Sequence, residues 1–200
     1  IIFVDTVASL YERNHLFELI KDVTKNIFIP ITVCGGIRSL KDIETALNSG
    51  ADKVAVNTAI FNKNFLLAEA CKHFGSSTIV SNVEAKEISN NKWEPYKNFG
   101  RDKTGWELQD WVKSLQDSGV GEILLTSVDQ DGTKKGFDLN LLNKIIHIVN
   151  VPLIISGGCG NLKHVEELKN FFFDKEVSIG IASCLHYNLT KIIEIKNILK

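Results

Sequence analysis

The sequence predicts an α/β fold in which helices cover a parallel sheet, and three observations favour this class. Short runs of β-branched and aliphatic residues alternate with longer segments of helical periodicity, as in consecutive βαβ units. The ends of these runs recur at regular intervals, and one stretch of the sequence is repeated. With 200 residues, 44% of them hydrophobic, the chain suits a single domain over residues 1–200.

Seven apolar runs predict strands, and each is apolar enough to be covered on both faces. We expect these strands at residues 1–5, 31–34, 53–57, 78–84, 122–127, 153–156 and 178–182. Pro30 and Pro152 precede two of them, where a missing backbone N–H disturbs the sheet least. Ser39 and Asp42 form a capping-box pattern at the start of a helix. We expect helices at residues 16–25, 39–47, 65–73, 106–117, 139–149, 162–172 and 189–199.

The spacing of the strand ends favours a barrel over a doubly wound sheet. Successive ends are 23 to 30 positions apart except for one interval of 47, and they are Asp5, Gly35, Thr58, Glu84, Asp131, Gly157 and Ser183. The long interval contains residues 90–100, whose alternation and turn residues predict a hairpin inserted after the fourth of these strands.

An internal repeat supports the barrel. Residues 31–40 and 153–162 share one layout, which is a strand, a Gly-Gly step and a capped helix. The repeat indicates two homologous halves, and four strands in each half give a (β/α)8 TIM barrel. Only seven strands are predicted, so we expect the first strand to be lacking. The chain also has no methionine and opens inside a strand, so we expect it to be N-terminally truncated.

Two Gly-Gly steps at the strand ends predict phosphate sites. Gly35-Gly36 and Gly157-Gly158 each lead into a helix N-terminus, where a backbone without side chains can approach an anion closely. Asn57-Thr58 and Ala182-Ser183, at the ends of the next strands, add small polar groups or bare amides. A structural turn would explain one such step. Two steps in the same register predict a ligand with a phosphate at each end.

Carboxylates follow the strands at the same end, where barrel enzymes carry their chemistry. They are Asp5, Glu84, Asp129 and Asp131. Burial of a carboxylate after an apolar strand is costly, so general acid–base catalysis is one interpretation. A helix cap or turn is the alternative, above all for Asp129 and Asp131. The histidines are scattered over helices and loops, so we expect no metal site and no cofactor.

Two charged residues lie at the opposite end of the strands. Lys53 and Glu122 each stand at the N-terminal entrance of an apolar strand. The usual interpretation of such positions is a solvated or ion-paired residue that stabilises the bottom face. The alternative is that their side chains turn into the barrel axis and close its base with charge.

Charge and cysteine content exclude several classes of protein. The formal net charge is −1 with both signs interspersed, which lacks the basic surface of a nucleic-acid-binding protein. The four cysteines form no CxxC pair, which disfavours a zinc site or a disulfide scaffold and suits the reducing cytoplasm. No apolar run approaches the roughly 18–20 residues of a membrane span, so we expect no membrane association.

Four runs of sequence resemble the cyclase subunit of imidazole glycerol phosphate synthase, the HisF family. They are Ile-Pro-Ile-Thr-Val-Cys-Gly-Gly-Ile-Arg-Ser-Leu, Gly-Ala-Asp-Lys-Val-Ala-Val-Asn-Thr, Gly-Glu-Ile-Leu-Leu-Thr-Ser-Val-Asp-Gln-Asp-Gly-Thr and Ile-Ser-Gly-Gly-Cys-Gly. The resemblance covers essentially the whole chain. It implies a cyclase of histidine biosynthesis that takes ammonia from a glutaminase docked at the N-terminal face of the barrel. The cyclase converts a bisphosphorylated ribulosyl intermediate into imidazole glycerol phosphate and aminoimidazole carboxamide ribotide.

The resemblance also implies roles for individual residues. It matches Gly36, Asn57 and Thr58 to one phosphate site, and Gly158, Ala182 and Ser183 to the other. Asp5 and Asp131 match aspartates that line the active site, with Thr126 and Ser156 nearby. Lys53 and Glu122 match two members of a charged gate for ammonia, which reverses the preference for a solvated or ion-paired stabilising role.

Three departures from the family pattern keep alternatives open. The family's general acid ends the strand that is lacking here. Glu84, in Ser-Asn-Val-Glu-Ala-Lys, replaces a second catalytic aspartate, and a misplacement of roughly 1 Å can cost on the order of a hundredfold in rate. The segment after Asp5 differs from the family's Asp-Ile-Thr-Ala-Ser. One alternative is a paralogous subunit that delivers ammonia for amidination of surface-polysaccharide sugars, and a less favoured one is a phosphosugar isomerase of the same fold.

Overall fold

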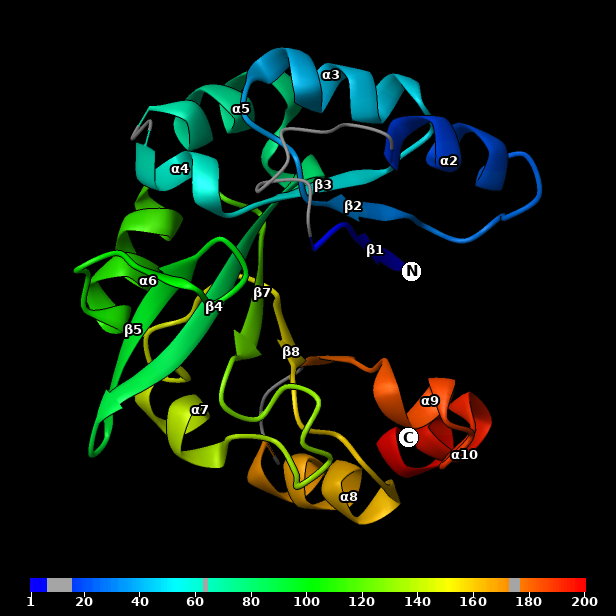
Figure 1. The fold of residues 1–200 in the computed structure, drawn as a ribbon, viewed down its shortest axis with the longest axis vertical. Helices are drawn as coiled ribbons and strands as arrows, with labels where there is room; N and C mark the ends of the chain where they lie inside the picture. Colours follow the sequence, from blue (N-terminus) through cyan, green and yellow to red (C-terminus); the bar gives the residue numbers. More distant parts are fainter. Residues whose placement is uncertain (7–15, 63–64, 173–176) are drawn as a thin grey trace.

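The fold is a curled parallel sheet covered by helices, seen in a computed structural model that describes residues 1–6, 16–62, 65–172 and 177–200 (Figure 1). Seven parallel strands lie in the order β1-β2-β3-β4-β7-β8-β9. Their bounds are Ile2–Val4 (β1), Thr32–Cys34 (β2), Lys53–Val56 (β3), Ile79–Ser89 (β4), Glu122–Ser127 (β7), Leu153–Ser156 (β8) and Ser178–Gly180 (β9). All seven predicted strands are confirmed.

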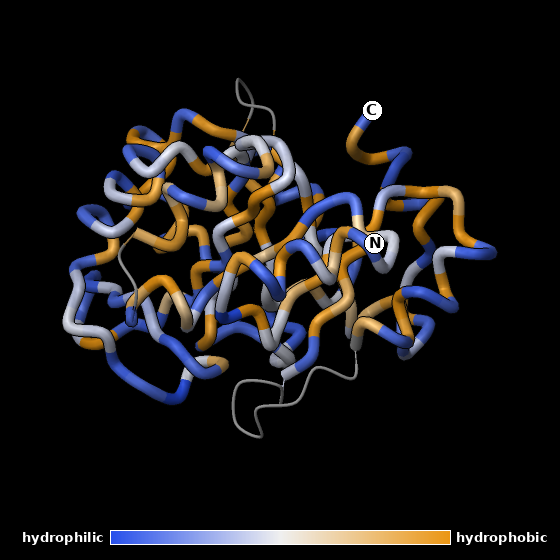
Figure 2. The backbone as a smooth tube through the Cα atoms, turned by 90° about the horizontal axis from the view of Figure 1, so that it is seen from above, coloured by the Kyte–Doolittle hydropathy of each residue, from blue (hydrophilic) through white to orange (hydrophobic). Residues whose placement is uncertain are grey.

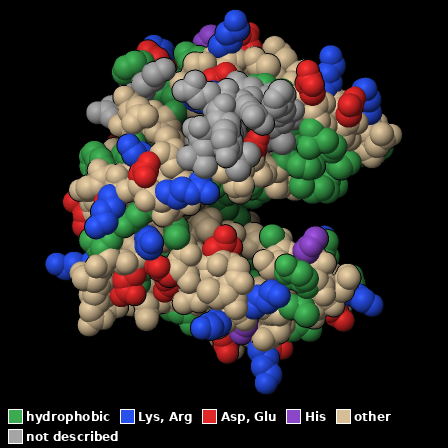
Figure 3. Space-filling view, viewed as in Figure 1, with side chains coloured by type: hydrophobic (Ala, Val, Ile, Leu, Met, Phe, Trp, Pro, Cys, Tyr) green, Lys and Arg blue, Asp and Glu red, His purple; other side chains and the backbone are tan. Residues whose placement is uncertain are grey.

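The sheet does not close. In the described part of the chain, β1 and β9 end the path of paired strands, and Figure 1 shows these two edges on either side of an opening. The space-filling view shows the same opening as a deep hollow between two lobes (Figure 3). Seven parallel strands with their helices therefore form a partial (β/α)8 barrel, which confirms the predicted fold class.

Each of the seven predicted helices is present. The helices of the described residues are α2 (Leu16–Val23), α3 (Leu40–Asn48), α4 (Thr58–Asn62), α5 (Leu66–Phe74), α6 (Leu108–Asp117), α7 (Leu139–Ile145), α8 (Leu162–Phe171), α9 (Ser183–His186) and α10 (Ile192–Leu199), with a 3₁₀ turn, η1, at Ser76–Thr78. The short helices α4 and α9 were not predicted. They follow directly on β3 and β9, so they begin where those strands reach the carboxyl edge of the sheet.

Several predicted bounds are wrong for local reasons. The helix expected from residue 106 begins at Leu108, because the Glu107 carboxylate accepts the N–H groups of Gln109 and Asp110 and so caps the helix. The helix expected from residue 189 begins at Ile192, where Glu194 accepts the N–H of Lys191. The helices expected to end at residues 25 and 149 end earlier, and the last strand stops at Gly180.

The predicted insertion is an antiparallel arm that extends the sheet. β4 was expected to end at Glu84, but it continues to Ser89 because β5 (Lys92–Lys97) pairs with it, and β6 (Asp102–Lys103) pairs with β5. The turn lies at residues 90–91, within the segment 90–100 that predicted a hairpin. The arm therefore projects beyond the carboxyl edge of the sheet and folds back over it.

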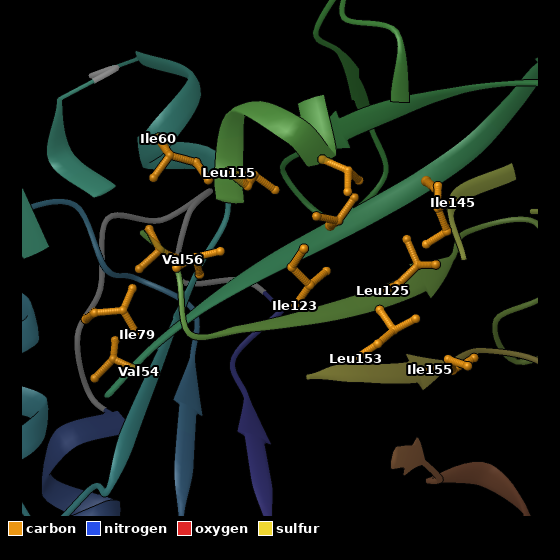
Figure 4. Close-up of a cluster of buried hydrophobic side chains, with 14 of the residues drawn as sticks. Val54, Val56, Ile60, Ile79, Leu115, Ile123, Leu125, Ile145, Leu153 and Ile155 are labelled. Atoms are coloured by element: carbon orange, nitrogen blue, oxygen red, sulfur yellow. The ribbon is translucent and has the colours of Figure 1, made fainter. Parts of the chain in front are cut away.

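Alternate residues of each strand pack on opposite faces. The convex face carries the main core, in which Val54, Ile79, Ile123, Leu125, Leu153 and Ile155 pack against helices (Figure 4). The concave face carries a smaller cluster of Cys34, Ala55, Val80 and Leu124. Figure 2 shows hydrophobic segments toward the middle of the molecule and hydrophilic ones in the outer loops. The concave cluster identifies which side chains point toward the barrel axis.

The opening leaves part of the concave face uncovered. Val4 pairs in register with Cys34, a member of the concave cluster, yet Val4 is 47% exposed.

No helix in the described residues is long and apolar enough to span a bilayer.

Candidate active site

Strand register lines up polar residues at the carboxyl edge of the concave face. Glu84 of β4 pairs with Thr126 of β7, Thr126 with Ser156 of β8, and Ser156 with Gly180 of β9. Thr126 lies two residues after Leu124, a member of the concave cluster, so this row faces the barrel axis. The structure thus places Glu84, predicted from its position at a strand end, in one layer with Thr126 and Ser156, which the resemblance implied.

A cavity of about 370 Å³ opens at the β2, β3 and β4 end of this layer. Its lining includes Gly36, Asn57 and Thr58, the residues expected at the first phosphate site, together with Glu84. It also includes residues that sequence reasoning did not single out, which are Arg38, Asn82, Asn98 and Phe99. A guanidinium group and backbone amides beside a buried carboxyl group suit an anionic substrate that undergoes proton transfer.

The Gly35-Gly36 turn brings backbone close to β1. Both glycines have positive φ, 113° and 73°, which side chains rarely adopt. A Cβ on Gly35 would lie 2.4 Å from the carbonyl oxygen of Asp5. The Asp5 N–H donates to the Cys34 carbonyl, 2.8 Å away, so β1 and β2 remain joined at this edge. Asp5 is therefore held at the end of its strand beside the first glycine turn.

Glu84 is a buried carboxyl group with a donor on each oxygen. Only 5% of the residue is exposed. The Gly100 N–H donates to Oε2 at 2.9 Å, and the Asn82 side-chain amide donates to Oε1 at 3.3 Å. Burial raises the pKa of Glu84 from 4.5 to about 6, and hydrogen bonds from Gly100, Asn82 and Asn57, with the charge of Arg101, partly oppose that rise. Both protonation states are therefore accessible near neutral pH, as acid–base catalysis requires.

The β5–β6 arm covers this cavity and is tied to two strand ends. The Asn98 N–H donates to the Thr58 hydroxyl at 3.0 Å, and the Asn57 side-chain nitrogen donates to the Tyr96 carbonyl at 3.3 Å. Asn98, Phe99 and Gly100 all have positive φ, so the arm turns sharply above Glu84. The buried Asn57 Oδ1 accepts no hydrogen bond from any described residue, which leaves an acceptor for a ligand in the cavity lining.

The second glycine turn packs against the loop that follows β7. Gly157 and Gly158 both have a φ of 96°. A Cβ on Gly158 would lie 1.9 Å from the Gly136 carbonyl oxygen, and the Gly136 N–H donates to the Gly158 carbonyl at 2.8 Å. Ala182 and Ser183 open α9 directly after β9, which pairs with β8. Gly158, Ala182 and Ser183 therefore follow neighbouring strands at the carboxyl edge, as expected for a second phosphate site.

The two aspartates after β7 differ in what they contact. The Asp129 carboxylate accepts the Glu87 N–H of β4 at 2.7 Å, a structural role that is neither the helix cap nor the local turn of the alternative. Asp131 is exposed, its N–H donates to the Ser127 carbonyl at 2.9 Å, and its backbone lies beside Gly157. Asp131 is thus exposed beside the second glycine turn.

Lys53 and Glu122 meet at the opposite end of the sheet. Lys53 Nζ lies 2.8 Å from Glu122 Oε2, and the side chains are 35% and 14% exposed. Both residues lie two positions before members of the concave cluster, Ala55 and Leu124, so the ion pair crosses β4 on the concave face. An ion pair on the concave face fits both interpretations of these residues, an ion-paired stabilising role and side chains turned into the barrel axis.

The histidines do not gather at the site. His73, His147, His164 and His186 lie on or beside helices, as predicted, and His15 lies outside the described residues. Residues 1–6, 16–62, 65–172 and 177–200 contain no cluster of three or more His, Cys, Asp or Glu side chains suited to a metal ion. The four cysteines are free and buried.

Comparison with known proteins places the chain in a family. A family model described as "Histidine biosynthesis protein" matches residues 1–191. The chain is 49% identical over 163 residues to imidazole glycerol phosphate synthase subunit HisF of Legionella pneumophila, and the aligned region covers 82% of this chain and 77% of the relative. The HisF subunit of Streptococcus gordonii is 42% identical over 198 residues, 98% of this chain and 77% of the relative. That of Hydrogenobaculum sp. is 41% identical over 200 residues, all of this chain and 79% of the relative. The chain belongs to the histidine biosynthesis protein family.

Proposed function

We propose that the protein is the cyclase subunit of imidazole glycerol phosphate synthase and works in histidine biosynthesis. The observation that carries the proposal is the buried Glu84 carboxyl group, with its pKa raised to about 6, in one cavity with Gly36, Asn57 and Thr58. The names of the relatives support the same activity. Four buried, free thiols suit a protein of the reducing cytoplasm.

The substrate of this proposal carries a phosphate at each end. One phosphate binds the Gly36 turn and Thr58, and the other binds Gly158, Ala182 and Ser183. The row of Glu84, Thr126 and Ser156 runs across the strands between the two sites, so a bound bisphosphate passes over the carboxyl group of Glu84. Phosphate oxygens are strong acceptors for the backbone N–H groups that such glycine turns and helix starts present.

Glu84 then acts as an acid–base catalyst. Ammonia that adds to the carbonyl carbon of a ribulosyl group yields a positively charged nitrogen that must lose a proton, which the ionised carboxylate accepts. The nitrogen of the departing ribotide needs a proton when its bond to the intermediate breaks, and the protonated carboxyl group supplies it. Asp5 and Asp131 are the further carboxylates that approach the substrate from β1 and from the loop after β7.

Ammonia enters from the other end of the sheet in this proposal. The Lys53–Glu122 ion pair lies at the N-terminal end of the concave face, where it forms part of a gate. A glutaminase subunit docks on the same end and releases ammonia toward that gate. Asp52, exposed and bonded through its carboxylate to the Ile31 N–H, lies beside the gate on this docking face.

One observation favours a second candidate function. Glu84 occupies the position at which the resemblance expects a catalytic aspartate, and its longer side chain changes where the carboxyl group lies. A paralogous subunit that passes ammonia to a partner for amidination of surface-polysaccharide sugars would keep the Lys53–Glu122 gate and tolerate this change. The two functions differ in whether the protein itself makes imidazole glycerol phosphate.

Growth of a histidine-requiring bacterium that lacks its own cyclase gene tests the proposal. Expression of the protein with a cognate glutaminase should restore growth without histidine, and Glu84→Gln should abolish it while protein levels stay equal. A matched variant, Ser81→Ala, changes a neighbouring buried residue of the same strand and should support growth. Absence of growth with soluble, folded protein would favour the amidination function instead.

A further inference from the structure

Asn82 is a buried polar residue on the strand that carries Glu84. It lies two residues before Glu84 on the concave face of β4, is 4% exposed, and lines the same cavity. Burial of a side-chain amide is costly unless it finds hydrogen-bond partners. A buried amide on the same face as Glu84, in the buried part of β4, therefore calls for an explanation beyond packing.

The Asn82 amide contacts the carboxyl group directly. Its Nδ2 donates to Glu84 Oε1 at 3.3 Å, while the Gly100 N–H of the covering arm donates to Oε2 at 2.9 Å. Asn82 and Gly100 thus donate to different carboxylate oxygens from different elements of the fold, and a side-chain hydrogen bond from Asn57 of the β3 end also lowers the pKa of Glu84. Two donors on opposite oxygens restrict rotation of the carboxyl group about its last side-chain bond.

We propose that Asn82 is a positioning residue that fixes the orientation of the Glu84 carboxylate in the cavity and favours its ionised form. This inference rests on the proposed acid–base role of Glu84. It also accounts for glutamate at this position, because an aspartate would withdraw the carboxyl group by about one C–C bond, roughly 1.5 Å, and lose the contact with Asn82.

Other charged groups face Glu84 and remain in place when Asn82 is changed. Arg101, between β5 and β6 of the covering arm, lowers the pKa of Glu84, and burial together with the Glu84 charge raises the pKa of the Cys34 thiol on β2. Arg38 lines the same cavity, and Tyr96 of β5 pairs with Glu84 in register. From β7 the paired residue is the neutral Thr126. An Asn82 variant therefore removes a hydrogen bond and leaves these groups unchanged.

Nuclear magnetic resonance of the unsubstituted protein gives the first test. Glutamate labelled with ¹³C at the side-chain carboxyl carbon reports the titration of Glu84, and the signal is assigned by its absence in Glu84→Gln. The Asn82 side-chain NH₂ signal, assigned by its absence in Asn82→Leu or Asn82→Ala, should shift with the same midpoint as the Glu84 carboxyl carbon. An Asn82 signal that does not follow the titration of Glu84 would overturn the proposal without any dependence on turnover.

Substitution gives the second test. Asn82→Leu, similar in volume but without a donor, should raise the pKa of Glu84 by about one unit and move the acid limb of the kcat/KM profile by the same amount. Loss of ionised carboxylate alone would lower kcat at pH 7 by about twofold, so a larger loss, on the order of tenfold, is expected from the misoriented carboxylate. KM for the bisphosphorylated substrate should change less than twofold. Asn82→Ala serves the same purpose if the leucine variant does not fold. Ser81→Ala, a buried neighbour in the same strand, is the control and should leave all three quantities unchanged.

The outcomes separate this inference from the proposed function. An unchanged Glu84 titration in a folded Asn82 variant overturns the positioning role. A normal coupling of the Asn82 and Glu84 signals together with no cyclase turnover in the unsubstituted protein supports the positioning role and contradicts only the proposed reaction.

Discussion

The buried carboxyl group of Glu84 should make the stability of the protein depend on pH, and Glu84→Gln should remove that dependence. Burial raises the pKa of Glu84 from 4.5 to about 6, so the folded state holds its proton more tightly than the unfolded state does. The stabilisation from this tighter binding is fully present below pH 4.5. It is lost as the pH rises through 6, since the folded state must then bury a charge.

The size of the effect follows from the shift. A rise of about 1.5 units, at about 1.36 kcal/mol per unit, corresponds to about 2 kcal/mol. Glutamine does not ionise, so the free energy of unfolding of Glu84→Gln should gain about 2 kcal/mol relative to the unsubstituted protein between pH 4 and pH 7.5. Glutamine cannot accept one of the hydrogen bonds that the carboxylate accepts, which adds a constant difference between the two free energies of unfolding. This constant difference does not alter how the difference changes with pH.

Urea unfolding at a series of pH values measures the effect. The three tryptophans provide the fluorescence signal, and equal urea dependence in both proteins makes the free energies comparable. The difference between the two proteins should change mainly between pH 4.5 and 6. Parallel stability curves over this range would refute the assignment of Glu84 as a desolvated carboxyl group.

Three further predictions concern other parts of the structure. Because the Lys53–Glu122 ion pair is partly buried, a double-mutant cycle of Lys53→Met and Glu122→Gln should give a coupling free energy of about 1–2 kcal/mol in urea unfolding. Additive effects of the two substitutions would contradict a formed pair. Gly158→Ala places a Cβ against the Gly136 carbonyl and should lower the free energy of unfolding, measured in urea, by at least about 3 kcal/mol. The control Gly132→Ala, also at positive φ but with open space around it, should cost about 1–2 kcal/mol, and equal losses would argue against close packing of the second glycine turn. Burial raises the pKa of Cys34 and of Cys159 to about 12, so the native protein should react slowly with Ellman's reagent. The urea-unfolded protein should rapidly release four equivalents of the reagent's coloured thiolate, one per cysteine, and rapid reaction of Cys34 or Cys159 in the native protein would contradict their burial.

The sequence predicted the seven parallel strands because a strand that is covered on both faces is a nearly continuous run of apolar residues. It misplaced the end of β4 because residues 85–89 pair with β5, and that pairing depends on the arm folding back. The four- and five-residue helices α9 and α4 are too short to show a helical period. These errors lie where tertiary contacts, and not local pattern, decide the structure.

The candidate site could be predicted only in part. Strand ends located Glu84 and the glycine turns, since the fold brings such residues to one edge. Asn82 was missed, although alternate residues of a strand share a face, so an amide two positions before Glu84 is a signal that could have found it. The Gly100 N–H reaches Glu84 across 16 positions through the covering arm, and Lys53 reaches Glu122 across 69 positions. Contacts of this kind follow from the folded geometry and have no local signature.

The most direct test asks whether the protein itself makes imidazole glycerol phosphate with Glu84 as acid–base catalyst. The protein is supplied with the bisphosphorylated ribulosyl intermediate and ammonium salt, and imidazole glycerol phosphate is detected by chromatography. We predict release of imidazole glycerol phosphate and the ribotide in equal amounts, with a rate that rises through a pKa near 6. Glu84→Gln should lose this activity by two or more orders of magnitude while it still binds the intermediate. Release at an undiminished rate by Glu84→Gln, or no release by folded protein that binds the intermediate, would contradict the account.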